Sequence, residues 1–226
     1  MYKKLDSKNF IDQITRYGFF AEQFPDCFSS ETFANNLPDL LPLISIGKAQ
    51  KEKSKKNTTA PTTLSTYKND ISRRVLSVSN PEAFLRLSKY IKDNWKDILE
   101  VTASPNSLSP ITFIRNYSFG SAEEMINCES IREKLKAKSD FIAGVKNCIR
   151  ASLGYKYRMK VDITNCYNSI YTHSITWAIC GKDLAKSYLR TAEPSSVKDK
   201  YEMGDFLDCF VRQQKNNETN GIIVGP

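Results

Sequence analysis

The segment YKYRMKVD, residues 155–162, constrains the fold of this chain more than any other stretch. Two sets of residues alternate along it: Tyr155, Tyr157, Met159 and Val161 on one face, and Lys156, Arg158, Lys160 and Asp162 on the other. Successive side chains of a strand point to opposite faces, so the pattern predicts a β-strand that packs one face and presents cations and a carboxylate on the other. A carboxylate beside cations suits a site that holds a divalent metal next to phosphates. The alternative is a half-exposed strand whose charges simply face water.

Composition and charge narrow the class of protein. The 226 residues include 33 Lys and Arg against 25 Asp and Glu, which gives a formal net charge of +8, and 40% of the residues are hydrophobic. This apolar content suffices for a folded core, and the excess of cations favours a polyanionic partner. The cysteines form no C-x-x-C pair, which argues against a zinc site. The first residues, MYKKL, match no signal peptide and no apolar run has the length of a membrane span, so we expect a cytoplasmic protein without a membrane partner.

The first third of the chain contains helix, loop and strand signals. Residues 1–46 predict short helices, one of them capped by Ser29 or Ser30. The charge run KAQKEKSKK and the following NTTAPTT, residues 48–63, predict a loop or, alternatively, an arm that contacts phosphates. Alternation in RRVLSV, residues 73–78, predicts a short strand with its two arginines on opposite faces.

Helix signals dominate the remainder. The sequence SNPE at 79–82 combines a capping box with a proline in the first turn and predicts a helix start. Apolar residues at helical spacing then predict helices near residues 84–98, 124–135, 141–149, 177–179 and 197–211, with a strand at 111–117.

Three stretches resemble motifs of the reverse transcriptases. VDITNCYNSIYTHSITWA, residues 161–178, resembles motif A in the form found in bacterial defence-associated and abortive-infection members. NETNGIIVGP, residues 217–226, resembles the glycine-rich motif B loop, with Ile223 in place of the usual proline, and SRRVLSVSNP, residues 72–81, is similar to the basic finger hairpin. The resemblance implies an α+β fold, a right-hand polymerase with fingers and a partial palm after an N-terminal helical extension. The implied domains are an extension and basic linker at 1–60, fingers at 61–154 and a partial palm at 155–226.

The resemblance also assigns a metal site and a sugar gate. Asp162 corresponds to the first metal-binding carboxylate, and the backbone carbonyl of Ile163 would join it as a ligand of Mg²⁺, an ion that prefers oxygen ligands. Tyr167 matches the aromatic gate that blocks a ribose 2′-hydroxyl, with a core tyrosine as the alternative. His173 follows in the same motif, and we expect it to cap a helix or to pack rather than to act as a general base.

Substrate contacts are assigned to two further places. Arg73 and Arg74 are candidates for the incoming triphosphate, because a guanidinium matches phosphate oxygens bidentately. Gly221 and Gly225 would let the motif B backbone approach the nascent base pair, since glycine has no Cβ to clash there.

The implied function is an RNA-directed DNA polymerase in bacterial anti-phage defence. Its partners would be an RNA template or non-coding RNA, dNTP and a DNA product, while untemplated synthesis and a homo-oligomer stay open. The family carries a further Tyr-x-Asp-Asp motif after motif B, and this chain ends at Pro226 before such a motif. We therefore expect a front half that alone incorporates no nucleotide, because one carboxylate cannot hold two cations about 3.5–4 Å apart. The alternative is a non-catalytic RNA-binding or assembly module.

Overall fold

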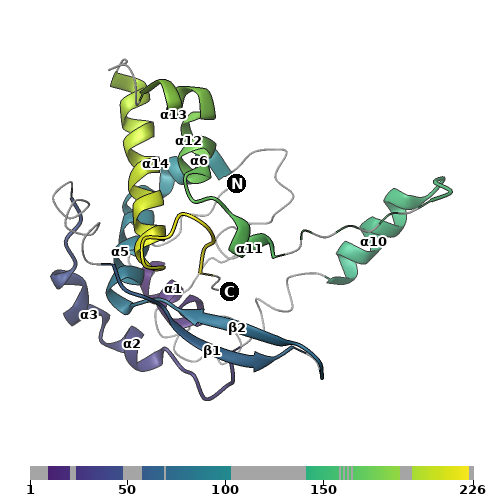
Figure 1. Cartoon of the computed structure of the whole chain (residues 1–226), viewed down its shortest axis with the longest axis horizontal. Helices are drawn as coiled ribbons and strands as arrows, with labels where there is room; N and C mark the ends of the chain where they lie inside the picture. Colours follow the sequence, from purple (N-terminus) through teal and green to yellow (C-terminus); the bar gives the residue numbers. More distant parts are fainter. Residues whose placement is uncertain are drawn as a thin grey trace. The chain divides into compact units, whose positions relative to one another are not determined.

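The chain divides into two compact units. The computed structural model describes residues 10–20, 24–47, 58–68, 70–102, 141–157, 159, 161, 163, 165–188 and 195–223. The main unit comprises Phe10–Ser107 and Asn165–Pro226, and the small unit comprises Met1–Asn9 and Leu108–Thr164. Helices and a two-stranded sheet together give a mixed helix-and-strand fold, which agrees with the α+β class at that coarse level (Figure 1). The expected domain limits after residues 60 and 154 stay a prediction.

An antiparallel hairpin forms the sheet of the main unit. Strand β1 (Thr62–Tyr67) pairs with β2 (Arg73–Val78), and the register joins Thr62 to Val78 and Tyr67 to Arg73. Strand β2 confirms the strand predicted there, whereas β1 begins inside a stretch for which the sequence predicts a loop. The threonines of this stretch are β-branched and suit a pleated strand once β2 supplies the backbone partners. Leu76 is buried against Phe24 and anchors the hairpin to the rest of the unit.

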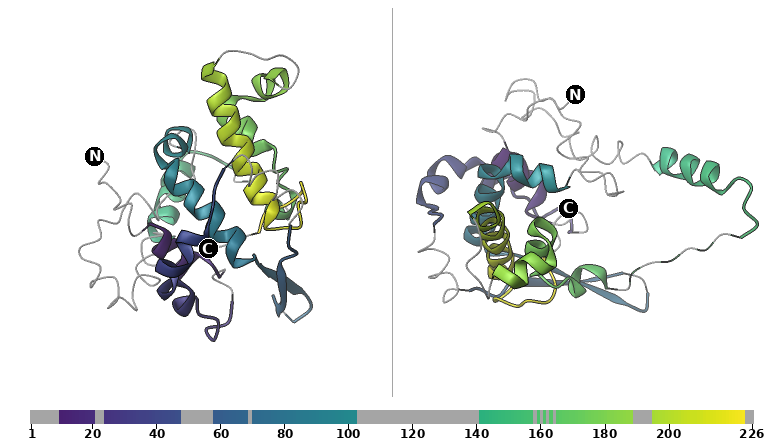
Figure 2. Two further views of the ribbon diagram at one scale, coloured as in Figure 1. Left: turned by 90° about the vertical axis from the view of Figure 1, so that its left-hand side faces the viewer. Right: turned by 90° about the horizontal axis from the view of Figure 1, so that it is seen from above.

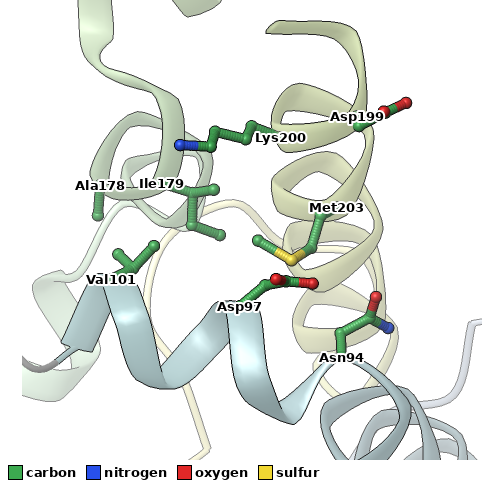
Figure 3. Close-up of a pocket in the computed structure, with 8 residues that line it drawn as sticks. All are labelled: Asn94, Asp97, Val101, Ala178, Ile179, Asp199, Lys200 and Met203. Carbon is green, nitrogen blue, oxygen red and sulfur yellow. The ribbon is translucent and has the colours of Figure 1, made fainter. Parts of the chain in front are cut away.

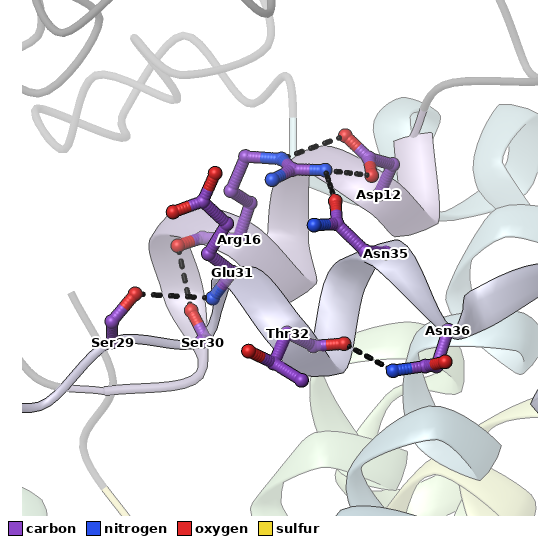
Figure 4. A network of polar contacts seen from close by, with 8 residues as sticks. All are labelled: Asp12, Arg16, Ser29, Ser30, Glu31, Thr32, Asn35 and Asn36. Carbon is purple, nitrogen blue, oxygen red and sulfur yellow. Dashed lines mark hydrogen bonds and ion pairs between the residues drawn. The ribbon is translucent and has the colours of Figure 1, made fainter.

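Short helices precede the hairpin, as predicted. They are α1 (Phe10–Gly18), α2 (Glu31–Asn35), α3 (Leu37–Leu40) and the 3-10 turn η1 (Leu41–Leu43). Figure 4 shows how polar contacts join α1 to α2: the Arg16 guanidinium donates to Asp12 at 2.9 Å and to Asn35 at 3.0 Å. Ser30 precedes α2 but does not cap it, because its hydroxyl donates to the carbonyl of Arg16 at 2.7 Å. Ser29 instead accepts from the first N–H of the helix.

The helix predicted after residue 80 is confirmed and is interrupted at one residue. Helix α5 (Pro81–Asp93) starts at Asn80, whose side chain accepts from the N–H groups of Glu82 and Ala83. The N-cap is therefore Asn80, one residue after Ser79, so the capping box expected from Ser79 does not form. Asn94 is the C-cap of α5, and helix α6 (Trp95–Thr102) begins at the next residue.

A long C-terminal helix organises the second half of the main unit. Helix α14 (Ser195–Gln213) runs beside α12 (Ser174–Cys180) and α5, while α13 (Lys182–Tyr188) follows α12 (Figure 2). Gly204 permits the close approach of α12, because a Cβ there would lie 2.8 Å from the Cα of Thr176. On another face, Phe206 and Phe210 pack their rings against Tyr90 of α5 at 5.6 and 5.2 Å. Burial and Glu202 raise the pKa of Tyr90 to about 12, so this ring remains neutral in the core.

The small unit contributes the predicted helix α10 (Phe141–Ser152) and one correction. None of the described residues between 155 and 163 lies in a strand. The apolar set expected to pack is exposed, at 78% for Tyr155, 84% for Tyr157 and Met159, and 75% for Val161. The prediction of a half-packed strand is therefore wrong for these residues. A strand needs a neighbour for its backbone N–H and C=O groups, and the described part of the chain supplies no second strand to this segment.

The predicted strand at 111–117 and the predicted helix near 124–135 lie outside the described residues. None of the described helices combines the length and apolarity that a membrane crossing requires.

Candidate functional site

Two stretches that the sequence analysis singled out lie side by side in the main unit. We call residues 165–173 the motif A segment and residues 214–223 the C-terminal turn. The N–H of Ile222 donates to the carbonyl of Tyr167 at 3.0 Å, and the N–H of Gly221 donates to Ile170 at 2.7 Å. One turn of helix, α11 (Cys166–Ser169), lies within the motif A segment, next to the C-terminal turn in Figure 1. The pairing brings Tyr167 and Gly221 into one site.

The pairing continues beyond these two bonds. The N–H of Thr172 donates to the carbonyl of Thr219 at 2.8 Å, and Tyr171 forms an isolated antiparallel bridge with Asn220. The N–H of Asn216 donates to the carbonyl of Thr59, just before β1, at 3.1 Å. The C-terminal turn is therefore fixed both to the motif A segment and to the base of the hairpin.

Gly221 occupies a position that no other residue fits easily. It is buried, with φ at +82°, and a Cβ there would lie 2.9 Å from the carbonyl oxygen and 3.0 Å from the Cα of Asn168. Glycine is therefore required where the turn contacts the motif A segment. The resemblance to motif B predicts that Gly221 approaches a base pair, and the geometry supplies a second, intramolecular reason for a glycine here.

Tyr167 lies at the surface of this site. Its side chain is 54% exposed, which excludes the alternative of a core tyrosine. The turn of α11 that carries it begins at Asn165, which has φ at +55° and accepts at 2.7 Å from the amide of Asn168. The ring is accessible to a ligand on a backbone that is held at both ends.

A buried polar network underlies the site. Asp208 of α14 is 0% exposed, and one of its carboxylate oxygens lies 2.7 Å from His173 Nδ1. Its other oxygen accepts from Arg212 Nε at 3.2 Å, and Arg212 donates in turn to Asn217 of the C-terminal turn at 2.9 Å. The network joins α14 to both paired segments. His173 stands at the N-cap position of α12 but makes no side-chain cap. Of the two roles expected for it, capping is not observed, whereas packing is, because its ring lies against that of Tyr171.

The sequence motifs assign no role to Asp208 or Arg212. A usable signal exists: Asp208 is a lone carboxylate within the apolar run FLDCFV, and an arginine follows four residues later on the same helix. A charge at a core position of a helix is almost always paired.

The two candidate arginines of the hairpin differ in their partners. Arg73 donates to Ser65 Oγ at 2.7 Å and to the Ser65 carbonyl at 2.9 Å, and its guanidinium lies 4.4 Å from the centroid of the Tyr67 ring. The guanidinium of Arg74 bonds to no described residue. No contact joins either arginine to Tyr167 or Gly221 within the described ranges. Arg74 is the one whose donors are available to an anion.

Of the two proposed metal ligands, only Ile163 lies within the described residues. Asp162 lies outside the described residues, as does Gly225, and Ile163 is 71% exposed. The described residues contain no group of three His, Cys, Asp or Glu side chains that could hold a metal ion. The described residues do not by themselves form a Mg²⁺ site.

A pocket of about 620 Å³ opens elsewhere in the main unit, between α6, α12 and α14 (Figure 3). Apolar side chains such as Ile179 and Met203 line it together with Asp97, Asp199 and Lys200. It includes none of the candidate residues. Cys180 also lies on α12, and burial raises the pKa of its thiol, so it is a poor nucleophile.

No protein-family model matches this chain, and a search of curated proteins finds no significant match. The interpretation of the site depends on the motifs and on the geometry described above.

Proposed function

We propose that this chain contains the nucleotide-binding part of an RNA-directed DNA polymerase of the reverse transcriptase type that acts in bacterial anti-phage defence. The pairing of the motif A segment with the C-terminal turn carries the proposal. The two stretches are far apart in sequence, yet backbone hydrogen bonds join them at Tyr167 and Gly221. A polymerase needs both motifs beside one nucleotide, and a direct junction supports that arrangement. In this proposal the β1–β2 hairpin belongs to the fingers and the paired segments belong to the palm.

The exposed groups of the site suit a deoxynucleoside triphosphate. The Tyr167 ring would lie beneath the sugar and leave no room for a 2′-hydroxyl. Arg74 would bind the phosphates, because its fork of donors is not engaged within the described structure. Asp162 and the carbonyl of Ile163 would hold Mg²⁺, which supplies neutralisation of phosphate charge when bound. The partners would be RNA, dNTP and the DNA product.

Primer extension by the protein expressed from its complete reading frame tests the proposal. With Mg²⁺ we expect dNTP incorporation on an RNA template or without a template, and we expect Asp162→Asn to abolish it while the circular dichroism spectrum stays unchanged. The substitution keeps the side-chain volume and removes the charge that a cation needs. RNA binding without synthesis under every template condition would overturn the proposal in favour of the non-catalytic binding module. Synthesis that persists in Asp162→Asn would overturn the assignment of Asp162.

The two hairpin arginines form a matched pair for a second prediction. Arg74→Ala should weaken the binding of inorganic tripolyphosphate to the chain about tenfold, since hydrogen bonds to charged groups contribute roughly 1.5–3 kcal/mol. Arg73→Ala should leave this affinity within about twofold and lower the melting temperature instead, because it removes the contacts to Ser65 and Tyr67. Isothermal titration calorimetry and a thermal melt on both variants make the comparison without requiring catalysis. The reverse pattern would show that Arg73 is the phosphate ligand.

A further inference from the structure

Three rings gather on the surface where the motif A segment enters α12. The ring centroid of Tyr171 lies 4.9 Å from that of His173, nearly perpendicular to it, and 5.5 Å from that of Trp177. Lys182 of α13 places its ammonium 5.0 Å from the centroid of the Trp177 ring. Tyr171 is 40% exposed and the His173 side chain 38% exposed. We call these four residues the aromatic patch.

The aromatic patch is held in place from beneath and from its edge. Asp208 is fully buried and fixes the imidazole through the 2.7 Å contact with His173 Nδ1. The backbone of Tyr171 is bridged to Asn220, and the N–H of Trp177 donates to the carbonyl of His173 at 3.2 Å. A surface that is already ordered loses little conformational entropy when it binds a ligand.

The patch differs from the aromatic packing of the core. Phe206 and Phe210 of α14 are 9% and 0% exposed against Tyr90, whereas Tyr171 is exposed and the side chains of His173 and Trp177 are half-buried. The aromatic patch also carries polar groups, namely the Tyr171 hydroxyl, the second ring nitrogen of His173 and the Lys182 ammonium. Such a surface suits a ligand made of planar rings that have hydrogen-bonding edges and are joined by anionic groups. Unpaired bases of a single strand have this chemistry, and they bind by stacking on aromatic side chains beside cations.

We propose that Tyr171, His173, Trp177 and Lys182 form a stacking surface for unpaired bases of a single-stranded nucleic acid, with Lys182 contacting a phosphate. The net charge of +8 favours the same polyanion. This inference rests on the proposed function only in taking a nucleic acid as the partner. It requires no catalysis and neither Asp162 nor Mg²⁺.

Trp177 itself reports on the binding. The chain contains two tryptophans, and Trp95→Phe keeps an aromatic ring against Phe10 while leaving Trp177 as the single fluorophore. In the full chain carrying Trp95→Phe, titration with a single-stranded 12-mer of DNA or RNA in EDTA should quench the Trp177 emission. The duplex of the same sequence should quench it less, because its bases are already stacked on one another.

Substitutions then separate stacking from charge. Tyr171→Ala and Trp177→Leu should each weaken single-strand affinity about tenfold, in the range that base stacking on aromatic side chains provides. Phe28→Ala is the control for exposed aromatic area, because Phe28 is also 40% exposed. Lys182→Ala should reduce the slope of log affinity against log salt by about 0.7. Lys186→Ala, an exposed lysine on the same helix, should change that slope less.

The outcomes distinguish this proposal from the polymerase proposal. Quenching of the Trp177 emission, together with a tenfold loss of single-strand affinity in Tyr171→Ala, supports the aromatic patch even where primer extension fails. Binding that leaves the Trp177 emission and the affinity of Tyr171→Ala unchanged places the strand elsewhere and overturns the patch. Absence of any single-strand binding overturns it as well and favours a protein partner for this surface.

Discussion

Asp208→Ala should lower the free energy of unfolding by about 3 kcal/mol, which makes it one of the two most destabilising changes that we predict. The substitution removes the acceptor for both His173 Nδ1 and Arg212 Nε. It leaves the Arg212 guanidinium, only 11% exposed, without its anionic partner. The loss of an ion-pair partner in a buried place costs more than the pair itself contributes, because the remaining charge stays desolvated. Urea denaturation measures the change.

A matched control lies on the same helix. Asp199 is exposed near the start of α14, and Asp199→Ala should change the free energy of unfolding by less than about 0.5 kcal/mol. Asp208→Asn should fall between the two, because an amide oxygen still accepts one hydrogen bond. Equal stabilities for Asp208→Ala and Asp199→Ala would contradict the view that the network holds the paired segments together.

The network also connects stability to the proposed site. Asp208 contacts His173 at one end of the motif A segment, and Arg212 contacts Asn217 in the C-terminal turn. A loss at Asp208 therefore loosens both sides of the junction that carries Tyr167 and Gly221. We expect Asp208→Ala to weaken nucleotide binding and single-strand binding together, while Asp199→Ala weakens neither.

The local signals of the helices were predictable from the sequence. Apolar residues at helical spacing identified α10 and α14, and the SNPE stretch at 79–82 marked the start of α5, although the cap is Asn80 and not Ser79. These patterns are reliable because a helix satisfies its backbone hydrogen bonds within its own segment. Its pattern needs no knowledge of the rest of the chain.

Strands and charged contacts were less predictable for the opposite reason. The alternation at 155–162 is a strong strand signal, yet a strand forms only with a partner, and the described residues supply none. Strand β1 was missed in turn, because its threonines resemble a polar loop until β2 pairs with them. The His173–Asp208 contact joins the motif A segment to α14 across 35 residues of sequence, so no local spacing predicts it. The proposed roles of Asp162 and Gly225 stay predictions, because both lie outside the described residues.

Gly221→Ala should reduce the free energy of unfolding by about 3 kcal/mol, and two other glycines separate its causes. The φ of +82° would strain an alanine by about 1–2 kcal/mol. Its Cβ would also press on the Asn168 backbone, with contacts of 2.9 and 3.0 Å. Overpacking of this kind adds about 1–3 kcal/mol. Backbone strain and overpacking both act at Gly221, so the predicted loss of unfolding free energy exceeds the typical cost of either effect alone.

The other two glycines each isolate one effect. Gly181 has φ at +88° and ψ at 143°, close to a region of backbone conformation that is essentially confined to glycine, and nothing lies within 4 Å of a Cβ there. Gly181→Ala should therefore lose about 1–3 kcal/mol from backbone strain alone. Gly204 lies within α14, where a Cβ would meet the Thr176 Cα at 2.8 Å, so Gly204→Ala should lose about 1–3 kcal/mol from overpacking alone. Urea denaturation of the three variants measures how much unfolding free energy each of them loses.

A Gly221→Ala loss of no more than about 1–2 kcal/mol, which backbone strain alone would cost, would mean that the C-terminal turn does not press on the motif A segment. The junction between Tyr167 and Gly221 would then not hold in solution, and the proposed function would lose the observation that carries it. A loss of about 3 kcal/mol, which needs both strain and overpacking, would support the junction by a measurement that involves neither nucleotide nor metal. The stability of one glycine variant therefore tests the geometry on which the proposed site depends.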